Sequence, residues 1–346
     1  MEFLSVGYER MRDLILEKSV QLGEENRTVP LLVRGEWGTG KSHLAEYVRA
    51  MAADLGVATA IVDLNARGQA LNYPQRFYPA LIESCRLDRS VSGLQQIISQ
   101  RLSTVDGRRA LLEYASTCEG ELAQSIEWLC REHGPEDGLA LSEHPAWTKL
   151  LGGDIAWAPY AYKRHRTLRR IGELVELLRA LGGRGLILVL DEVETIDQLW
   201  NRRSRMTAYS TLGALCSMDH VWCVLAVTAR FDAIVAADFA WSLISRSGHT
   251  SEAAWFLGAL KRGEFQSVVP PTIDIEGAQD LAERLRRLYE NAYGLSSSSV
   301  DTLAATIGAW SRDPRRNART LIRAVVNELD LRRPLPKCPP PHAGVR

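Results

Sequence analysis

A glycine-rich segment near the N-terminus has the residue types and spacing of a phosphate-binding loop. It reads G-x-x-x-x-G-K-S and comprises Gly35, Glu36, Trp37, Gly38, Thr39, Gly40, Lys41 and Ser42, with His43 directly after it. Glycines let successive backbone N–H groups point at phosphate oxygens at the positive end of the following helix. Lys41 would reach the β- and γ-phosphates, and the Ser42 hydroxyl would coordinate Mg²⁺. The segment predicts a nucleotide site, against the alternative of a chance group of turn residues.

Two adjacent acids follow a second apolar run, LILVL, at residues 186–190. A carboxylate at the end of a buried strand can hold Mg²⁺ through water, and a second carboxylate beside it can deprotonate an attacking water. We therefore predict Asp191 as a metal residue together with Ser42, and Glu192 as the catalytic base of hydrolysis. The alternative is a surface acid pair that opens a helix. Glu194 and Asp197 are interpreted as a solvated face or a partner contact.

A third apolar run, Val221–Val227, ends at Thr228, whose hydroxyl could sense the γ-phosphate or the attacking water. An ordinary strand threonine is the equal alternative. No N-K-x-D motif for guanine recognition occurs in the sequence, so the expected nucleotide is ATP.

Arginines near the C-terminus could report which nucleotide is bound. In the segment DPRRNARTL we expect Asp313 to cap a helix and Pro314 to lie in its first turn, so that Arg315 projects from the helix start toward the γ-phosphate. A solvated basic face is the alternative. An arginine that acts on a neighbouring subunit could come from several positions, which the sequence does not rank: Arg202, Arg203, Arg205, Arg230 and Arg246.

Strand and helix patterns that alternate along the chain must position these residues. We expect strands at Pro30–Arg34, Val57–Leu64, 186–190 and Val221–Val227, in an α/β fold with an open parallel sheet flanked by helices. Residues 69–184 read as a large, mostly helical insertion. The predicted domains are a P-loop core at 1–274, a C-terminal helical lid at 275–331 and a disordered tail at 332–346.

The composition of the 346 residues places limits on the class of protein. Lysine plus arginine and aspartate plus glutamate both number 42, so no net charge points to nucleic acid or membrane. The six cysteines form no CxxC pair, and no apolar run has the length of a membrane span. We therefore expect a soluble cytoplasmic protein. Only residues 157–170, where aromatics alternate with lysine and arginine, suggest a local DNA surface; a basic helix start is the alternative.

Taken together, GEWGTGKS, LILVLDE, Thr228 and DPRRNARTL resemble the AAA+ ATPases, an ASCE-type group of P-loop NTPases, and within them the origin-recognition-type and STAND-like branch. More narrowly, RGEWGTGKSHLAEYVR, IVDLNARGQALNYPQRFYPAL, ILVLDEVETI and the opening FLSVG look like the family that contains the ATP-binding proteins of BREX phage-defence systems. The resemblance covers roughly residues 3 to 330. It implies the roles given above for the loop and the acid pair, with Thr228 as first sensor and Arg315 as second.

Two functions follow from this resemblance. The first is an ATP-hydrolysing assembly switch or motor in bacterial anti-phage defence, a homo-oligomer acting on DNA with partner proteins of methyltransferase or helicase type. The second is a STAND-type signalling NTPase that switches protein contacts without DNA and uses its helical insertion as the partner surface. A small-molecule kinase ranks below both, because no acceptor-binding motif appears.

Overall fold

A computed structural model of the chain describes residues 5, 7–24, 27–65, 70–132, 144–150, 152, 160–244, 250–293, 301–314 and 316–332. The chain forms two compact units. One unit holds Tyr8–Trp37 and Lys41–Pro270, and the other holds Met1–Gly7, Gly38–Gly40 and Pro271–Arg346. The domain boundaries proposed from the sequence stay a prediction.

The first unit is built on a five-stranded sheet in the order β2-β3-β4-β1-β5, in which every neighbouring pair is parallel. The strands are β1 (Leu31–Arg34), β2 (Ala58–Asp63), β3 (Leu186–Asp191), β4 (Val221–Val227) and β5 (Gln266–Val268). The expected parallel α/β sheet is therefore confirmed. Strand β5 was not predicted from the sequence. It pairs with β1 at the sheet edge, where Leu32 lies opposite Ser267.

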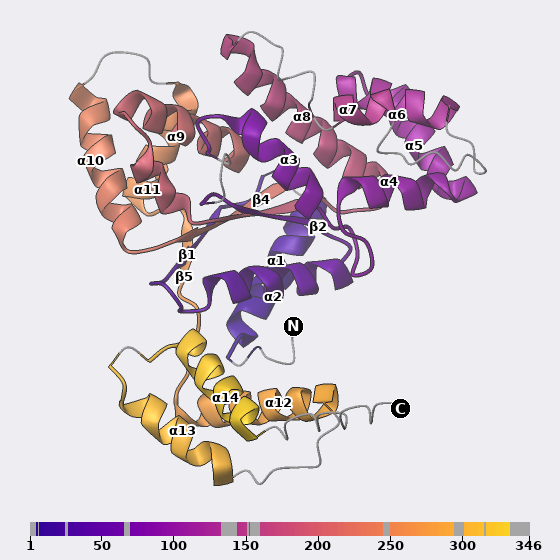
Figure 1. Ribbon diagram of the computed structural model, residues 1–346. Coiled ribbons are helices and arrows are strands. Elements are labelled where there is room, and N and C mark those ends of the chain that lie inside the picture. The colour runs from indigo at the N-terminus through magenta and orange to yellow at the C-terminus, as the bar shows by residue number, and fades with distance from the viewer. Residues whose placement is uncertain are drawn as a thin grey trace, which may run out of the picture. The chain divides into compact units, whose positions relative to one another are not determined.

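Side chains alternate between two faces of the sheet, and both faces are covered by helices (Figure 1). In β3, Leu188 and Leu190 pack into one hydrophobic core while Val189 packs into the other. In β4, Trp222 and its neighbour Cys223 divide in the same way. Strands buried on both faces read as continuous apolar runs, and this is why β3 and β4 could be recognised in the sequence.

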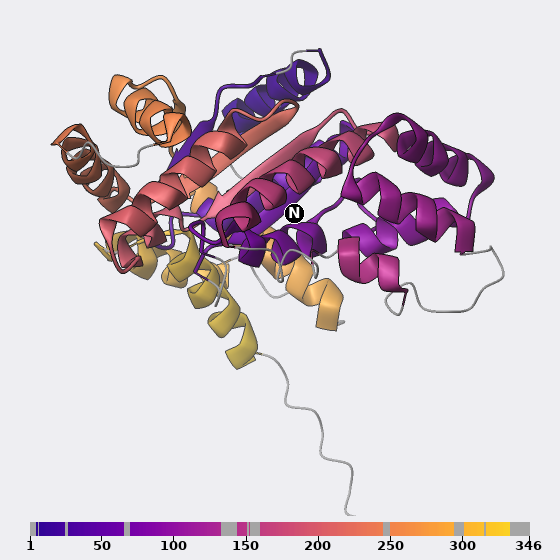
Figure 2. The same cartoon turned by 90° about the horizontal axis from the view of Figure 1, so that it is seen from above.

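One face is covered by α1 (Glu9–Glu24) and α2 (Lys41–Asp54). On the opposite face, helices that connect β2 to β3 share the hydrophobic core with the sheet. Among the described residues these are α3 (Pro74–Ser84), α4 (Leu94–Leu102), α5 (Val105–Thr117), α6 (Glu121–Glu132), α7 (Pro145–Leu150) and α8 (Tyr160–Ala180). Helices α4 to α7 gather beside the β2 edge of the sheet, as Figures 1 and 2 both show.

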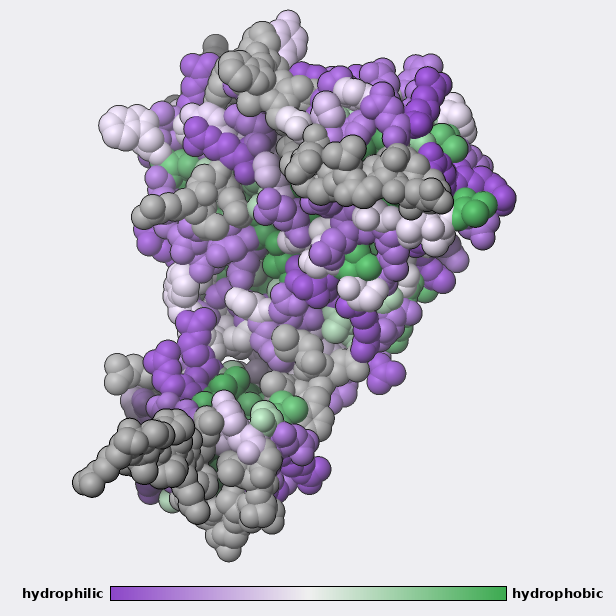
Figure 3. All heavy atoms as spheres, turned by 45° about the vertical axis from the view of Figure 1, so that its right-hand side comes forward, coloured by the Kyte–Doolittle hydropathy of each residue, from purple (hydrophilic) through white to green (hydrophobic). Residues whose placement is uncertain are grey.

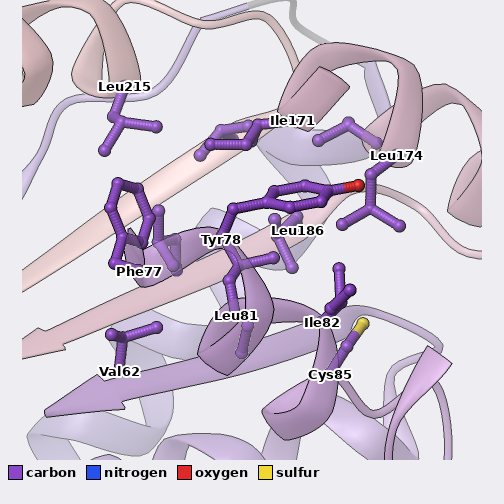
Figure 4. Close-up of a cluster of buried hydrophobic side chains, with 14 of the residues drawn as sticks. Val62, Phe77, Tyr78, Leu81, Ile82, Cys85, Ile171, Leu174, Leu186 and Leu215 are labelled. Atoms are coloured by element: carbon purple, nitrogen blue, oxygen red, sulfur yellow. The ribbon is translucent and has the colours of Figure 1, made fainter. Parts of the chain in front are cut away.

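Helix α3 ties this helical region to the sheet. Its residues Phe77, Tyr78 and Leu81 are fully buried. They belong to the same hydrophobic cluster as Leu186 of β3 and Ile171 of α8, which Figure 4 shows. The Tyr78 hydroxyl donates a hydrogen bond of 3.2 Å to a backbone carbonyl at the end of α7. The helical region and the sheet therefore share one continuous core.

Between β3 and β5 the described residues form, besides β4, a short 3-10 helix and three α-helices. These are η4 (Val193–Gln198), α9 (Arg202–Cys216), α10 (Arg230–Ile244) and α11 (Ser251–Arg262). Helix α9 begins at Arg202 because the Asn201 side chain caps it, accepting from the backbone N–H of Ser204 at 2.8 Å.

The second unit contains α12 (Ile275–Tyr293), α13 (Asp301–Arg312) and α14 (Ala318–Arg332) around a small core of their own. The expected cap of the last helix is wrong. Helix α14 begins at Ala318, and it is Asn317 that caps it, accepting from the backbone N–H of Thr320 at 3.0 Å. Asp313 and Pro314 lie in the connection before it.

The described surface is largely hydrophilic, with small separate apolar areas on the face shown in Figure 3. No helix in the described ranges combines the length and the apolar character needed to cross a membrane.

Candidate functional site

The loop predicted to bind phosphate connects β1 directly to α2. Gly38 and Gly40 have φ of +83° and +102°, in the region that residues with a side chain rarely adopt. The backbone N–H of Gly35 donates to the carbonyl of Val227, at the end of β4, over 3.0 Å. The start of the loop is thus fixed to the neighbouring strand, and its glycines allow the tight turn that the motif predicts.

The Lys41 ammonium lies over the loop that precedes it. Its Nζ donates to the carbonyl oxygen of Gly35 at 2.6 Å and to that of Glu36 at 3.2 Å, and it stands 6.0 Å from the ring centroid of Trp37. Trp37 itself is 60% exposed. A compact cation on a flexible stem is therefore held by carbonyls at the start of the loop, partners that phosphate oxygens could replace.

Ser42 and Asp191 meet although they lie far apart in the sequence. The Ser42 hydroxyl, in the first turn of α2, donates to Asp191 Oδ2 at 2.8 Å. The other carboxylate oxygen of Asp191, the last residue of β3, accepts from the backbone N–H of Glu192 at 2.9 Å. Hydroxyl and carboxylate oxygens are the protein ligands that Mg²⁺ prefers, so this pair fits that ion.

Glu192 has an unusual backbone conformation for a residue other than glycine. Its φ of 59° and ψ of 44° lie in the left-handed region, and its carbonyl accepts from Thr195 through both the backbone N–H, at 3.0 Å, and the hydroxyl, at 2.8 Å. Such strain concentrates at functional positions. Burial, followed by the nearby charges of Asp63 and Asp191, raises the pKa of Glu192. A carboxylate with a raised pKa is a better proton acceptor.

Thr228 follows β4, and β4 lies between β1 and β3 in the sheet. Because the carboxyl ends of parallel strands share one edge, Thr228 stands between the loop that follows β1 and the acid pair that follows β3. The residue is 4% exposed and its carbonyl accepts from the backbone N–H of Phe231 at 3.0 Å. The sheet order thus brings together the three predicted parts of the site that lie at strand ends.

His43, Glu194 and Asp197 complete this region. Burial lowers the pKa of His43, whose ring meets that of Tyr8 edge-on with centroids 5.6 Å apart. Both carboxylate oxygens of Glu194 are buried and have no hydrogen-bond partner among the described residues, so the expectation of a solvated face is wrong for this residue. Asp197 forms an ion pair with Arg230. The acidic residue types alone gave no signal that would separate Glu194 from Asp197.

The candidate sensor arginine and the arginines that could act on a neighbouring subunit have different surroundings. Arg315 and Arg246 lie outside the described residues. The guanidinium of Arg202 lies 5.7 Å from the ring centroid of Trp241, while Arg203 is exposed. Arg205 donates two hydrogen bonds to Asp238, of 3.1 and 2.9 Å, and Asp238 is 1% exposed. Arg205 is therefore already engaged inside this chain.

Most cations of the suggested DNA surface are also engaged. Arg166 and Arg170 of α8 both donate to the Glu121 carboxylate, and Arg169 donates to Glu173 at 3.0 Å. Arg170 is 1% exposed. Of the predicted aromatic partners, Tyr162 is exposed, whereas the side chains of Trp157 and Tyr160 lie outside the described residues. The middle of α8 thus forms salt bridges with carboxylates of the same chain.

A parallel sheet covered by helices, with this loop after β1 and an acid pair after β3, is the arrangement of P-loop-type nucleotide-binding folds. Residues 1–132 and 163–230 match the model of the family described as BREX system ATP-binding protein BrxC/D. The chain belongs to this family of BREX system ATP-binding proteins. The matched residues include the loop, both acids and Thr228. No curated protein matches the sequence.

Proposed function

We propose that the chain binds ATP with Mg²⁺ and hydrolyses it as an AAA+ protein of a BREX phage-defence system. The observation that carries this proposal is the 2.8 Å contact between Ser42 Oγ and Asp191 Oδ2, beside a loop over which Lys41 is folded. Membership of a family described as ATP-binding supports the choice of nucleotide.

Each residue then has a separate task. The loop N–H groups and Lys41 hold the phosphates, and Ser42 and Asp191 hold Mg²⁺, which supplies positive charge to the phosphate oxygens. Glu192 orients the attacking water and takes its proton, which its raised pKa favours. Thr228, between these two groups, contacts the γ-phosphate or the water. Arg315 remains our choice for the second sensor.

The larger task that we propose is an ATP-driven assembly switch or motor, a homo-oligomer that acts with DNA and with partner proteins of the defence system. The second candidate is a nucleotide-controlled protein switch without DNA. The pairing of Arg166, Arg169 and Arg170 with carboxylates of the same chain favours this second candidate, because it neutralises three cations of the surface that the sequence suggested.

Steady-state ATPase measurements test both candidates. Wild type, Lys41→Ala and Glu192→Gln would be compared with and without single- and double-stranded DNA, with Lys149→Ala on α7 as the control for loss of a lysine. Turnover in wild type and the control, absent from the two site variants and raised by DNA, supports the first candidate. Turnover that survives Lys41→Ala overturns the proposed site. Slow turnover that DNA does not change supports the second candidate, the protein switch.

A further inference from the structure

A polar pocket of about 300 Å³ lies where the starts of α3, α8 and α9 meet, within the first unit. Helices α3 and α9 follow the carboxyl ends of β2 and β3, so the pocket lies toward the same sheet edge as the acid pair. Its lining includes Asn72, Lys163, Arg164, Asn201, Arg203 and Ser204. No carboxylate belongs to the lining among the described residues, so the pocket has the charge to take an anion.

Two buried polar atoms of the lining have no hydrogen-bond partner among the described residues: Asn72 Oδ1 and Arg164 Nε. Asn72 is only 7% exposed. Because a buried polar group without a partner is costly, these atoms indicate that something polar completes the pocket.

The guanidinium of Arg164 is held in place for such a ligand. Its Nη2 donates to the carbonyl of Ser210 at 2.8 Å and to the Ser210 hydroxyl at 2.6 Å, which fixes the plane of the group. Burial lowers the pKa of Arg164, and the charge of Glu252, which lies outside the lining, acts in the opposite direction. Nε has no hydrogen-bond partner among the described residues, and the guanidinium brings a fixed positive charge to the lining, which favours a phosphate group.

Two further features of α9 favour a phosphate group. The Asn201 side chain caps the backbone N–H of Ser204, and the other N–H groups of the first turn lie at the positive end of a 15-residue helix. The exposed side chain of Arg203 projects from the same turn, and Lys163 adds a third cation to the lining.

Trp200, the residue before Asn201, indicates which class of phosphate-containing ligand the pocket binds. Trp200 is 94% exposed, the most exposed of the large hydrophobic side chains in the described part of the chain. Exposed aromatics beside cations that contact phosphate are the usual means of binding single-stranded nucleic acid, because every base can stack on them.

We propose that this pocket binds a phosphodiester group of single-stranded nucleic acid, with an adjacent base stacked on Trp200. Asn72, Arg164 and Arg203 contact the backbone. The inference deepens the DNA part of the proposed function and rests on it. Because η4 connects Glu192 to Trp200, a strand bound here touches the segment that begins at the proposed catalytic base.

The test is binding of a fluorescently labelled single-stranded oligonucleotide to the full chain by anisotropy at low salt, without ATP. Trp200→Ala and Arg203→Gln should each weaken binding about tenfold, since stacking and phosphate contacts have this order of effect. Arg203→Gln should also lower the salt dependence by about one phosphate contact. Arg109→Gln, which removes a 73% exposed cation on α5, is the control and should bind as wild type does.

Two outcomes overturn the proposal. In one, neither Trp200→Ala nor Arg203→Gln changes oligonucleotide affinity. In the other, inorganic phosphate or pyrophosphate displaces the oligonucleotide and Trp200→Ala has no effect, which would make this a site for free phosphate only. Both exposed positions can be changed without disturbing the core, and thermal unfolding of each variant confirms that it is folded. The same oligonucleotide binding is measured in Lys41→Ala. Nucleic-acid binding is therefore tested independently of whether the protein hydrolyses ATP.

Discussion

Ser42 Oγ and Asp191 Oδ2 lie 2.8 Å apart, although 149 residues separate them in the chain. If both hold one Mg²⁺, then Ser42→Ala and Asp191→Asn should each raise the Mg²⁺ concentration needed for half-maximal ATPase activity, and the double variant should be little worse than either single one. Magnesium titrations of the four proteins measure this. Asp219→Asn, which changes an acid just before β4 at the opposite end of the sheet, should titrate as wild type does; strictly additive losses would contradict a shared ion.

Lys41→Ala should weaken ATP binding roughly 10- to 100-fold, since hydrogen bonds to charged groups contribute about 1.5–3 kcal/mol. The present partners of Nζ, the carbonyls of Gly35 and Glu36, are neutral and belong to the same loop, so their loss should leave stability nearly unchanged. Calorimetric titration with ATP measures the affinity, with Lys149→Ala as the matched variant. An unchanged Kd would exclude Lys41 from the phosphate site.

Two substitutions separate the catalytic role of the Glu192 side chain from the energetic cost of its backbone conformation. Glu192→Gln keeps the shape of the side chain and should bind ATP while slowing hydrolysis about 100-fold or more, the usual contribution of a general base. Glu192→Gly should be equally slow but more stable than wild type by about 1 kcal/mol, because φ of 59° costs a glycine almost nothing. Denaturant unfolding and ATPase rates test the pair; a destabilised glycine variant would argue against backbone strain at this position.

Asp238 is the centre of a buried polar group on α10. It accepts from Arg205 and, at 3.1 Å, from the Tyr209 hydroxyl. Asp238→Ala should destabilise the protein by about 3–5 kcal/mol, because it leaves the largely buried cation of Arg205 without its counter-charge. Asp232→Ala on the same helix breaks the more exposed pair with Arg34 and should cost about 0–1 kcal/mol. Urea unfolding compares them, and equal losses would contradict the assignment.

The C-terminal unit should carry a pH-dependent stability. Hydrogen bonds from Arg286 lower the pKa of Glu283 from 4.5 to about 2. Because the folded-state pKa is depressed, this contribution is complete above pH 4.5 and is lost as the pH falls from there toward about 2. Glu283→Gln should therefore flatten the fall in unfolding midpoint across this window. Glu276→Gln, in the first turn of the same helix, is the comparison; if it flattens the curve as much, the pairing with Arg286 is not the cause.

The parts of the fold that could be predicted are those whose signal is local. Strands β3 and β4 are apolar runs followed by polar residues, and their burial on both faces explains the pattern. Strand β5 was missed because Gln266 and Ser267 are exposed and only three residues pair with β1, so that tertiary contact alone makes this segment a strand. Two residues, Asp313 and Asn317, could cap the last helix by type. Trp310 selects Asn317, because its indole N–H donates to the Asn317 carbonyl at 3.1 Å.

The candidate site divides in the same way. The glycine motif identified Lys41 and Ser42 by spacing, and Asp191 was identified by its place after an apolar run; the structure places Ser42 and Asp191 in contact. Their chemical roles stay predictions. The left-handed backbone of Glu192 and the burial of the Glu194 carboxylate depend on how η4 packs. The residue types in this segment do not predict that packing. The pairing of Arg166 and Arg170 with Glu121 likewise depends on a helix 45 or more residues away.

Burial of β3 and β4 on both faces, with a strand on either side of each, has a consequence for motion. Amide protons in the middle of these strands should exchange with deuterium only through global unfolding, whereas those of the glycine loop should exchange through local opening. Asp191 and Thr228 therefore stand at the ends of the segments that we expect to exchange most slowly, and we expect the glycine loop to open independently of them. Nucleotide entry and release would then require movement of the loop and none of the strands.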